Sequence, residues 1–204
     1  MNEPTSFPND TTGDEPACDW ALMHRVKVGD EGAFRELIER HQRSVIGVAA
    51  RMLSDDTEAE DMAQQVFIRV WKSAARWEPT AKFTTWLYTI LRNLVFNESR
   101  RRSKRPTRSL DAVIEEGDRP QQFEDTGAKP PDVALLDAEL QEAVDRAISE
   151  LPESQRMAIV LRRYQNVSYE EIAEVLEVTV PAVKSVLFRA RTELKEKLRV
   201  YLEG

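Results

Sequence analysis

Apolar residues recur at steps of three and four residues along much of the chain, which is the spacing of one face of an α-helix. Three such runs lie at residues 34–52, 62–71 and 86–95, and Pro79 predicts a break before the third. Strand-like alternation is hard to find, and the sequence contains only seven glycines. The pattern therefore predicts a helical block over residues 20–105.

Two segments without this pattern divide the chain. Residues 1–19 contain five acids and no base, and they are predicted to form a disordered acidic tail. Residues 106–134 are rich in proline and acids, which is typical of a flexible linker. A second helical block follows over residues 135–204. We therefore expect an all-α fold of two small helical domains joined by a flexible acidic linker.

The second block contains a sequence with helix-turn-helix spacing. Ser168 and Glu171 have the spacing of a capping box at the start of one helix, and Thr179 is placed to cap the next. In such a motif the second helix stands in the major groove of DNA, with its outward side chains against base edges. The outward residues, whose types contact bases or phosphates, are Lys184, Ser185, Phe188 and Arg189. The alternative is two helices of an ordinary bundle with a solvated basic face.

The end of the first block combines aromatic and basic residues. Trp77, Phe83, Trp86 and Tyr88 crowd a short segment, and a basic run follows at residues 100–105. Aromatic faces stack unpaired bases and cations follow the backbone, so this combination is typical of single-stranded DNA binding. The alternative is that the aromatic side chains are core residues and the basic run is a solvated tail.

The charge distribution qualifies the formal net charge of −7, which by itself argues against nucleic acid. Residues 92–108 contain seven bases and one acid, and residues 184–199 contain six bases and two acids. Two basic segments therefore lie in a chain made acidic by its tail and its middle. Because those acids repel phosphate, we expect the free protein to bind DNA weakly.

Several other classes of protein are disfavoured. The single cysteine, Cys18, cannot form an internal disulfide, which favours a reducing cytoplasm. The first residues lack the pattern of a signal peptide, and no apolar run approaches the roughly 20 residues of a membrane span. His24 and His41 lie far apart without cysteine partners, so no metal is expected. Without a glycine-rich phosphate loop or a nucleophile–base pattern, we expect neither a cofactor nor enzymatic activity.

Six short motifs occur in order along both blocks. They are Glu60-Asp-Met-Ala-Gln-Gln-Val-Phe-Ile-Arg-Val-Trp71, Phe83-Thr-Thr-Trp-Leu-Tyr-Thr-Ile-Leu-Arg-Asn93, Leu151-Pro152, Tyr169-Glu-Glu-Ile-Ala173, Val183-Lys-Ser185 and Arg189-Ala-Arg191. In order and spacing the chain resembles the extracytoplasmic-function (ECF) sigma factors of bacterial RNA polymerase, from about Asp30 to Leu198. The resemblance implies that residues 20–105 form sigma domain two and residues 135–204 form sigma domain four.

The resemblance also implies roles for the matching residues. Domain two would dock on core RNA polymerase through Asp61, Gln64, Gln65, Phe67, Ile68 and Trp71. It would capture and open the −10 promoter element with Trp77, Lys82, Tyr88, Arg92, Asn93, Arg100 and Arg101. Domain four would read the −35 element with Thr179, Lys184, Ser185, Phe188 and Arg189. We expect the docking residues to be exposed, with a place in the core as the alternative for Phe67.

Two departures from the family pattern fall in the helix-turn-helix. Val186 stands where family members often carry Arg, and Pro181-Ala182 stands where Gly-Thr is common, so the −35 contacts are expected to differ in detail. The implied partners are core RNA polymerase, promoter DNA and an anti-sigma factor, without membrane insertion. The rival hypothesis is a stand-alone helix-turn-helix regulator, which would bind duplex DNA as a dimer without polymerase.

Overall fold

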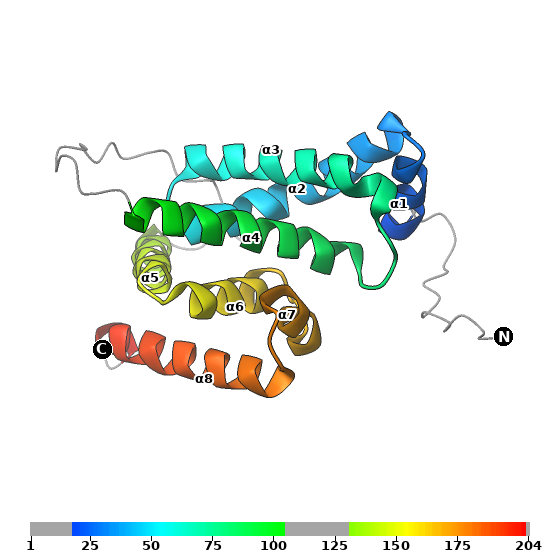
Figure 1. Cartoon of the computed structure of the whole chain (residues 1–204). Coiled ribbons are helices and arrows are strands. Elements are labelled where there is room, and N and C mark those ends of the chain that lie inside the picture. Colours follow the sequence, from blue (N-terminus) through cyan, green and yellow to red (C-terminus); the bar gives the residue numbers. More distant parts are fainter. Residues whose placement is uncertain (1–17, 105–130, 203–204) are drawn as a thin grey trace.

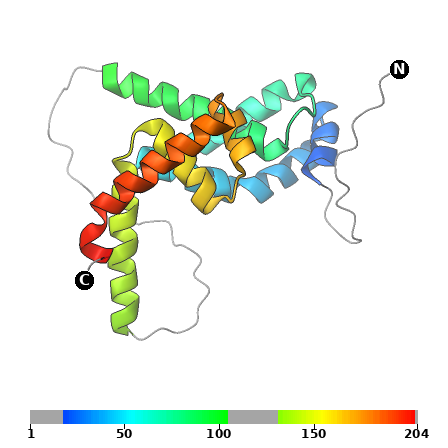
Figure 2. The same cartoon turned by 90° about the horizontal axis from the view of Figure 1, so that it is seen from below.

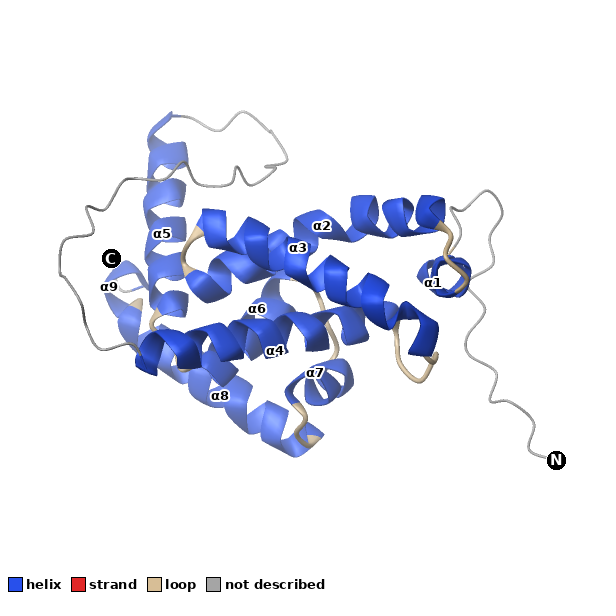
Figure 3. Cartoon of the chain, turned by 45° about the horizontal axis from the view of Figure 1, so that its top comes forward, coloured by secondary structure: helices blue, strands red, loops and turns tan. Residues whose placement is uncertain are grey.

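The protein is described by a computed structural model that covers residues 18–104 and 131–202. Most of the predicted tail, and the predicted linker up to residue 130, lie outside the described residues. Within them, every regular element is a helix and none is a strand (Figure 3). The predicted all-α fold is confirmed. None of these helices has the length and apolar character that a membrane span requires.

Residues 18–104 form the N-terminal bundle. Its elements are α1 (Asp19–Lys27), α2 (Glu31–Leu53), α3 (Asp56–Ser73), the 3-10 turn η1 (Ala74–Arg76) and α4 (Phe83–Lys104). Asp30 and Asp55 begin α2 and α3 by accepting hydrogen bonds from backbone N–H groups three residues further on. Gly29 makes the turn before α2 with a φ of 92°, a conformation that favours glycine. The predicted apolar faces meet in a core that includes Leu22, Leu37, Val45, Val48, Val66, Leu87 and Leu91.

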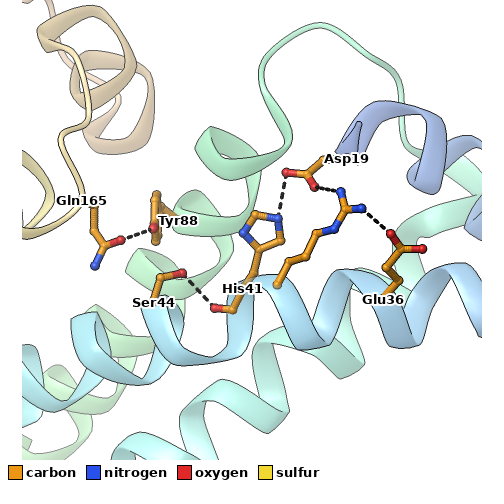
Figure 4. Close-up of polar contacts among 7 residues, drawn as sticks. Asp19, Glu36, His41, Ser44, Tyr88 and Gln165 are labelled. Carbon is orange, nitrogen blue, oxygen red and sulfur yellow. Dashed lines mark hydrogen bonds and ion pairs between the residues drawn. The ribbon is translucent and has the colours of Figure 1, made fainter. Parts of the chain in front are cut away.

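A polar network ties the short helix α1 to α2. The Asp19 carboxylate lies 2.8 Å from His41 Nε2 and accepts a hydrogen bond of 3.2 Å from Arg40 Nη1 (Figure 4). Arg40 also bonds Glu36 one turn earlier on α2. The ring of His41 lies 5.2 Å from that of Phe83, at the start of α4. The network therefore holds α1, α2 and the start of α4 together.

Residues 131–202 form the C-terminal bundle. Its helices are α5 (Pro131–Ser149), α6 (Glu153–Tyr164), α7 (Tyr169–Leu176), α8 (Val180–Lys197) and α9 (Arg199–Leu202). Helix α5 begins at Pro131, inside the segment that we predicted as linker. Proline suits the first turn of a helix because the backbone N–H that it lacks has no partner there. The bundle core includes Leu151, Met157, Leu161, Ile172, Val183 and Leu187.

The two bundles pack against each other through helices α4 and α7 and through α2 and α6 (Figure 1). At the second contact, Arg156 Nη1 donates a 2.7 Å hydrogen bond to the carbonyl oxygen of Met52. The guanidinium of Arg51 stacks 3.9 Å above the ring of Tyr164, a favourable cation–π contact. Helix α8 lies on the side of the molecule away from α3 (Figures 1 and 2).

Candidate nucleic-acid interface

The predicted helix-turn-helix is present as α7, a tight turn and α8. Ser168 Oγ accepts from the backbone N–H of Glu171 at 3.2 Å, and the Glu171 carboxylate accepts from the N–H of Ser168 at 2.8 Å. Glu177 turns the chain in the left-handed region with a φ of 57°. Thr179 caps α8 by accepting a hydrogen bond from the N–H of Ala182. The capping box and the second cap that we predicted are therefore confirmed.

Helix α8 has one buried and one open face. Val183, Leu187 and Ala190 are buried against the rest of the C-terminal bundle. The outward residues expected from the sequence are all exposed, namely Lys184, Ser185, Phe188 and Arg189. Phe188 is 72% exposed, so an aromatic ring stands on a face that also offers cations and a hydroxyl. This face combines the side-chain types that contact base edges, thymine methyl groups and phosphates.

The loop between α3 and α4 borders a cavity of about 340 Å³. Trp77, Thr85 and Trp86 contribute to its walls, and so does Glu174 from α7 of the other bundle. Trp77 is 4% exposed, and its ring lies 6.4 Å from the rings of both Trp20 and Trp86. The alternative of aromatic core packing therefore holds for Trp77, whose position also makes it part of the cavity wall.

Tyr88 and Arg92, both expected to contact the −10 element, are nearly buried between the bundles. Tyr88 is 4% exposed, and its hydroxyl donates a 3.0 Å hydrogen bond to Gln165 Oε1 (Figure 4). Burial raises the pKa of the Tyr88 phenol, which therefore stays neutral. Arg92 is 9% exposed and forms an ion pair with Glu177, in the turn of the helix-turn-helix.

A third expected −10 residue also contacts the C-terminal bundle. Lys82 Nζ lies 2.9 Å from Glu171 Oε1, at the start of α7. Burial raises the pKa of Glu171, but hydrogen bonds from the backbone of Ser168 and from Lys82 outweigh it and lower that pKa overall. Glu171 is therefore ionised at neutral pH, where it serves both the capping box and the contact between the bundles.

The remaining expected −10 residues lie in the open. Asn93 is exposed and borders a shallow pocket beside the end of α3. Arg100 and Arg101 are exposed further along α4, where Arg101 bonds Glu98 at 2.8 Å. The bases that line the pocket with Asn93, which the sequence reasoning missed, are Arg69, Lys72 and Arg76. They recur at steps of three and four residues, so their helical spacing was the signal that would have found them.

Helix α3 presents the expected docking residues, with one exception. Asp61, Gln64, Gln65, Ile68 and Trp71 are exposed on one face. Ile68 is 51% exposed and Trp71 38%, so apolar surface remains uncovered there. The expectation that Phe67 is exposed is wrong, because Phe67 is only 6% exposed. It shares the inner helical face with Ala63, Val66 and Val70, all of them buried.

Comparison with known proteins defines the class of this chain. The family model for Sigma-70 region 2 matches residues 37–105, and the model for Sigma-70, region 4 matches residues 141–194. The RNA polymerase sigma-H factor of Pseudomonas aeruginosa is 35% identical over 188 residues, which cover 90% of this chain and 95% of the relative. The ECF RNA polymerase sigma-E factor of Escherichia coli K12 is 35% identical over 190 residues, which cover 91% of this chain and 96% of the relative.

Solved structures share the fold. CnrH, in complex with the cytosolic domain of CnrY, superposes with a TM-score of 0.66 at 23% identity and covers 89% of this chain and 97% of its own. The sigma factor RpoE of Bartonella quintana, in complex with the anti-sigma factor NepR, has a TM-score of 0.61 at 24% identity and covers 82% and 97%. Together with the family models and the sequence relatives, this arrangement is that of a two-region sigma factor. The chain belongs to the ECF sigma factors of RNA polymerase.

Proposed function

We propose that this sigma factor divides its work among three surfaces. Helix α3 docks on core RNA polymerase through Asp61, Gln64, Gln65, Ile68 and Trp71. Helix α8 reads the −35 element with Lys184, Ser185, Phe188 and Arg189, while Thr179 at its start contacts the adjoining phosphates. Helix α4 and the loop before it engage the −10 element with Trp77, Lys82, Tyr88, Arg92, Asn93, Arg100 and Arg101, and they hold the opened strand.

The open face of α8 is the observation that carries the proposal. Its four outward side chains are exposed, while the opposite face of the same helix is fully packed. A recognition helix needs this division, because base edges in the major groove are reached only by side chains that the protein core leaves free. The stand-alone regulator shares this feature, but it does not account for the exposed apolar residues Ile68 and Trp71 on α3.

The proposal extends to the setting in which the protein works. It carries out no chemistry of its own, since RNA synthesis belongs to the polymerase, and it acts beside the polymerase in the cytoplasm. The sigma factor RpoE of Bartonella quintana was solved with an anti-sigma factor. We propose that this chain, too, is held inactive by an anti-sigma factor.

Run-off transcription with purified core polymerase tests the proposal. The chain should direct specific transcripts from a genomic promoter library, and core polymerase alone should not. A size-exclusion experiment with core polymerase should show the two proteins migrating together. The rival regulator instead predicts a dimer that binds duplex DNA in the absence of polymerase and adds no transcripts.

A further inference from the structure

Three of the residues proposed to contact −10 DNA, Lys82, Tyr88 and Arg92, have partners in the other bundle in this arrangement. Arg92 is paired with Glu177, and the Tyr88 hydroxyl donates to Gln165. The Lys82 ammonium lies 2.9 Å from the Glu171 carboxylate. Each of these partners belongs to the helix-turn-helix or to the segment just before it.

Helix α7 presents an acidic face to α4. Glu171, Glu174 and Glu177 follow one another at steps of three residues, and two of the three are ion-paired with bases of the N-terminal bundle. The third, Glu174, lines the cavity beside Trp77. Carboxylates bind guanidinium and ammonium groups with the same charge-assisted hydrogen bonds that phosphates use. The acidic face of α7 therefore fits the surface that would otherwise receive the DNA backbone.

The contact is incompletely satisfied at its centre. The Arg92 side chain is 11% exposed, and its Nε is buried without a hydrogen-bond partner among the described residues. A buried, unpaired donor on a charged group is unfavourable, and it regains hydration when the surface opens. The Glu177 side chain, by contrast, is 68% exposed and loses little when it leaves. The contact is therefore suited to reversible opening.

We propose that the acidic face of α7, together with Gln165 at the end of α6, is an intramolecular competitor of −10 DNA. The acidic face occupies Lys82 and Arg92, and Gln165 occupies Tyr88, until the two bundles separate. The inference rests on the proposed function, since that function assigns these residues to the −10 element. The two bundles must separate on a promoter, because the −35 and −10 elements are about 25 base pairs apart. This spacing places them about 85 Å apart along B-form DNA. The open faces of α3 and α8 stay exposed in the closed arrangement, so polymerase and −35 DNA meet the protein before −10 DNA does.

The first test measures DNA binding by the full chain without polymerase. The probe is a fluorescein-labelled single-stranded oligonucleotide of mixed sequence, followed by anisotropy at low salt. Glu177→Gln removes a partly exposed ion pair and should raise affinity about threefold. Glu177→Lys places like charges together and should raise it about tenfold. Glu196→Lys is the matched control, since it makes the same charge change near the far end of α8 and should raise affinity less than Glu177→Lys does.

The second test measures the separation of the bundles without any DNA. Spin labels at Val28→Cys and Val200→Cys, in a Cys18→Ser background, report the distance between two exposed positions on different bundles. Glu177→Lys, or Arg92→Glu alone, should broaden the distance distribution and shift it away from that of the wild-type chain. The reversed pair, Arg92→Glu with Glu177→Arg, should restore the wild-type distance distribution, which a general loss of structure would not do.

The outcomes separate this inference from the proposed function. Equal DNA affinities for Glu177→Lys and Glu196→Lys would overturn the proposal that α7 competes with −10 DNA. Distance distributions that no variant changes would overturn it as well. Run-off transcription by the wild-type chain is scored independently. Failure there overturns the proposed function, whereas normal transcription with unchanged distances overturns only the competition by α7.

Discussion

Replacing Ile68 by alanine tests the docking face of α3 with little effect on the fold. Ile68 is 51% exposed, so about half of its side chain remains available for burial by a partner. Full burial of an isoleucine stabilises by about 1.5–3 kcal/mol, so the available half is worth about 1 kcal/mol. Affinity for core polymerase should therefore fall about fivefold, because about 1.4 kcal/mol corresponds to a tenfold change. The buried half of the side chain limits the loss of folding stability to about 1 kcal/mol.

The assay is a fluorescence titration of labelled core polymerase, with thermal unfolding followed in parallel. Val28→Ala is the matched control, because Val28 is an apolar residue of the same bundle that lies at the end of α1, outside α3, and is 84% exposed. It should bind polymerase normally. Adding Asp61→Arg and Gln64→Ala to Ile68→Ala should weaken binding further. Unchanged affinity in the triple variant, with normal helicity, would refute docking through this face.

Three further changes test the other surfaces and the fold. Arg189→Ala should relax preference at one or two base pairs of the −35 element, since a lost bidentate base contact costs about 1–3 kcal/mol of discrimination. Selection from a randomised library measures this, and a uniform loss across sequences would instead assign Arg189 to a phosphate. Asn93→Ala should slow open-complex formation by the holoenzyme without weakening polymerase binding, because its amide both donates to and accepts from a base edge. Permanganate footprinting reports the defect, and a pre-melted template should rescue it. Asp19→Asn should destabilise the protein at neutral pH. Burial raises the pKa of Asp19, but the hydrogen bonds and charges of His41 and Arg40 outweigh it and lower that pKa overall. The contribution of Asp19 is thus present above the ordinary value of 3.8 and is lost as the pH falls through the lowered one. Urea unfolding at a series of pH values should show the deficit shrinking toward acid, and a constant deficit would contradict the assignment.

Local features of this protein were predictable because local physics determines them. The inner face of α2 follows from apolar residues at steps of three and four, and the start of α7 follows from Ser168 and Glu171 three residues apart. The same reasoning placed Lys184 and Phe188 on the outer face of α8, since burial of Val183 and Leu187 leaves those positions outward. Such patterns need no knowledge of distant parts of the chain.

Features that depend on distant packing were not predictable. Phe67 is a different case, because the resemblance to a docking helix predicted exposure while its helical spacing with Val66 and Val70 favoured the core alternative, which the structure bears out. Tyr88 and Arg92 were expected to be open to DNA, but their partners lie 77 and 85 residues further along the chain. Pairings at such separations depend on how two bundles meet, which leaves no periodic signal within either. The start of α5 at Pro131 was obscured by the proline and acid content before it.

Glu177 has opposite effects on fold stability and on the control of activity. Its left-handed backbone conformation is unfavourable, while its side chain makes the ion pair with Arg92. A side chain in this conformation costs about 1–2 kcal/mol, more than the backbone freedom of about 0.5–1 kcal/mol that glycine would lose there. Glu177→Gly should therefore yield a helix-turn-helix that melts later while the ion pair to Arg92 disappears. A screen for heat-resistant variants of this sigma factor would therefore favour chains that have lost the ion pair between Glu177 and Arg92. The most robust chain in such a screen would also be the one most prone to bind DNA without polymerase.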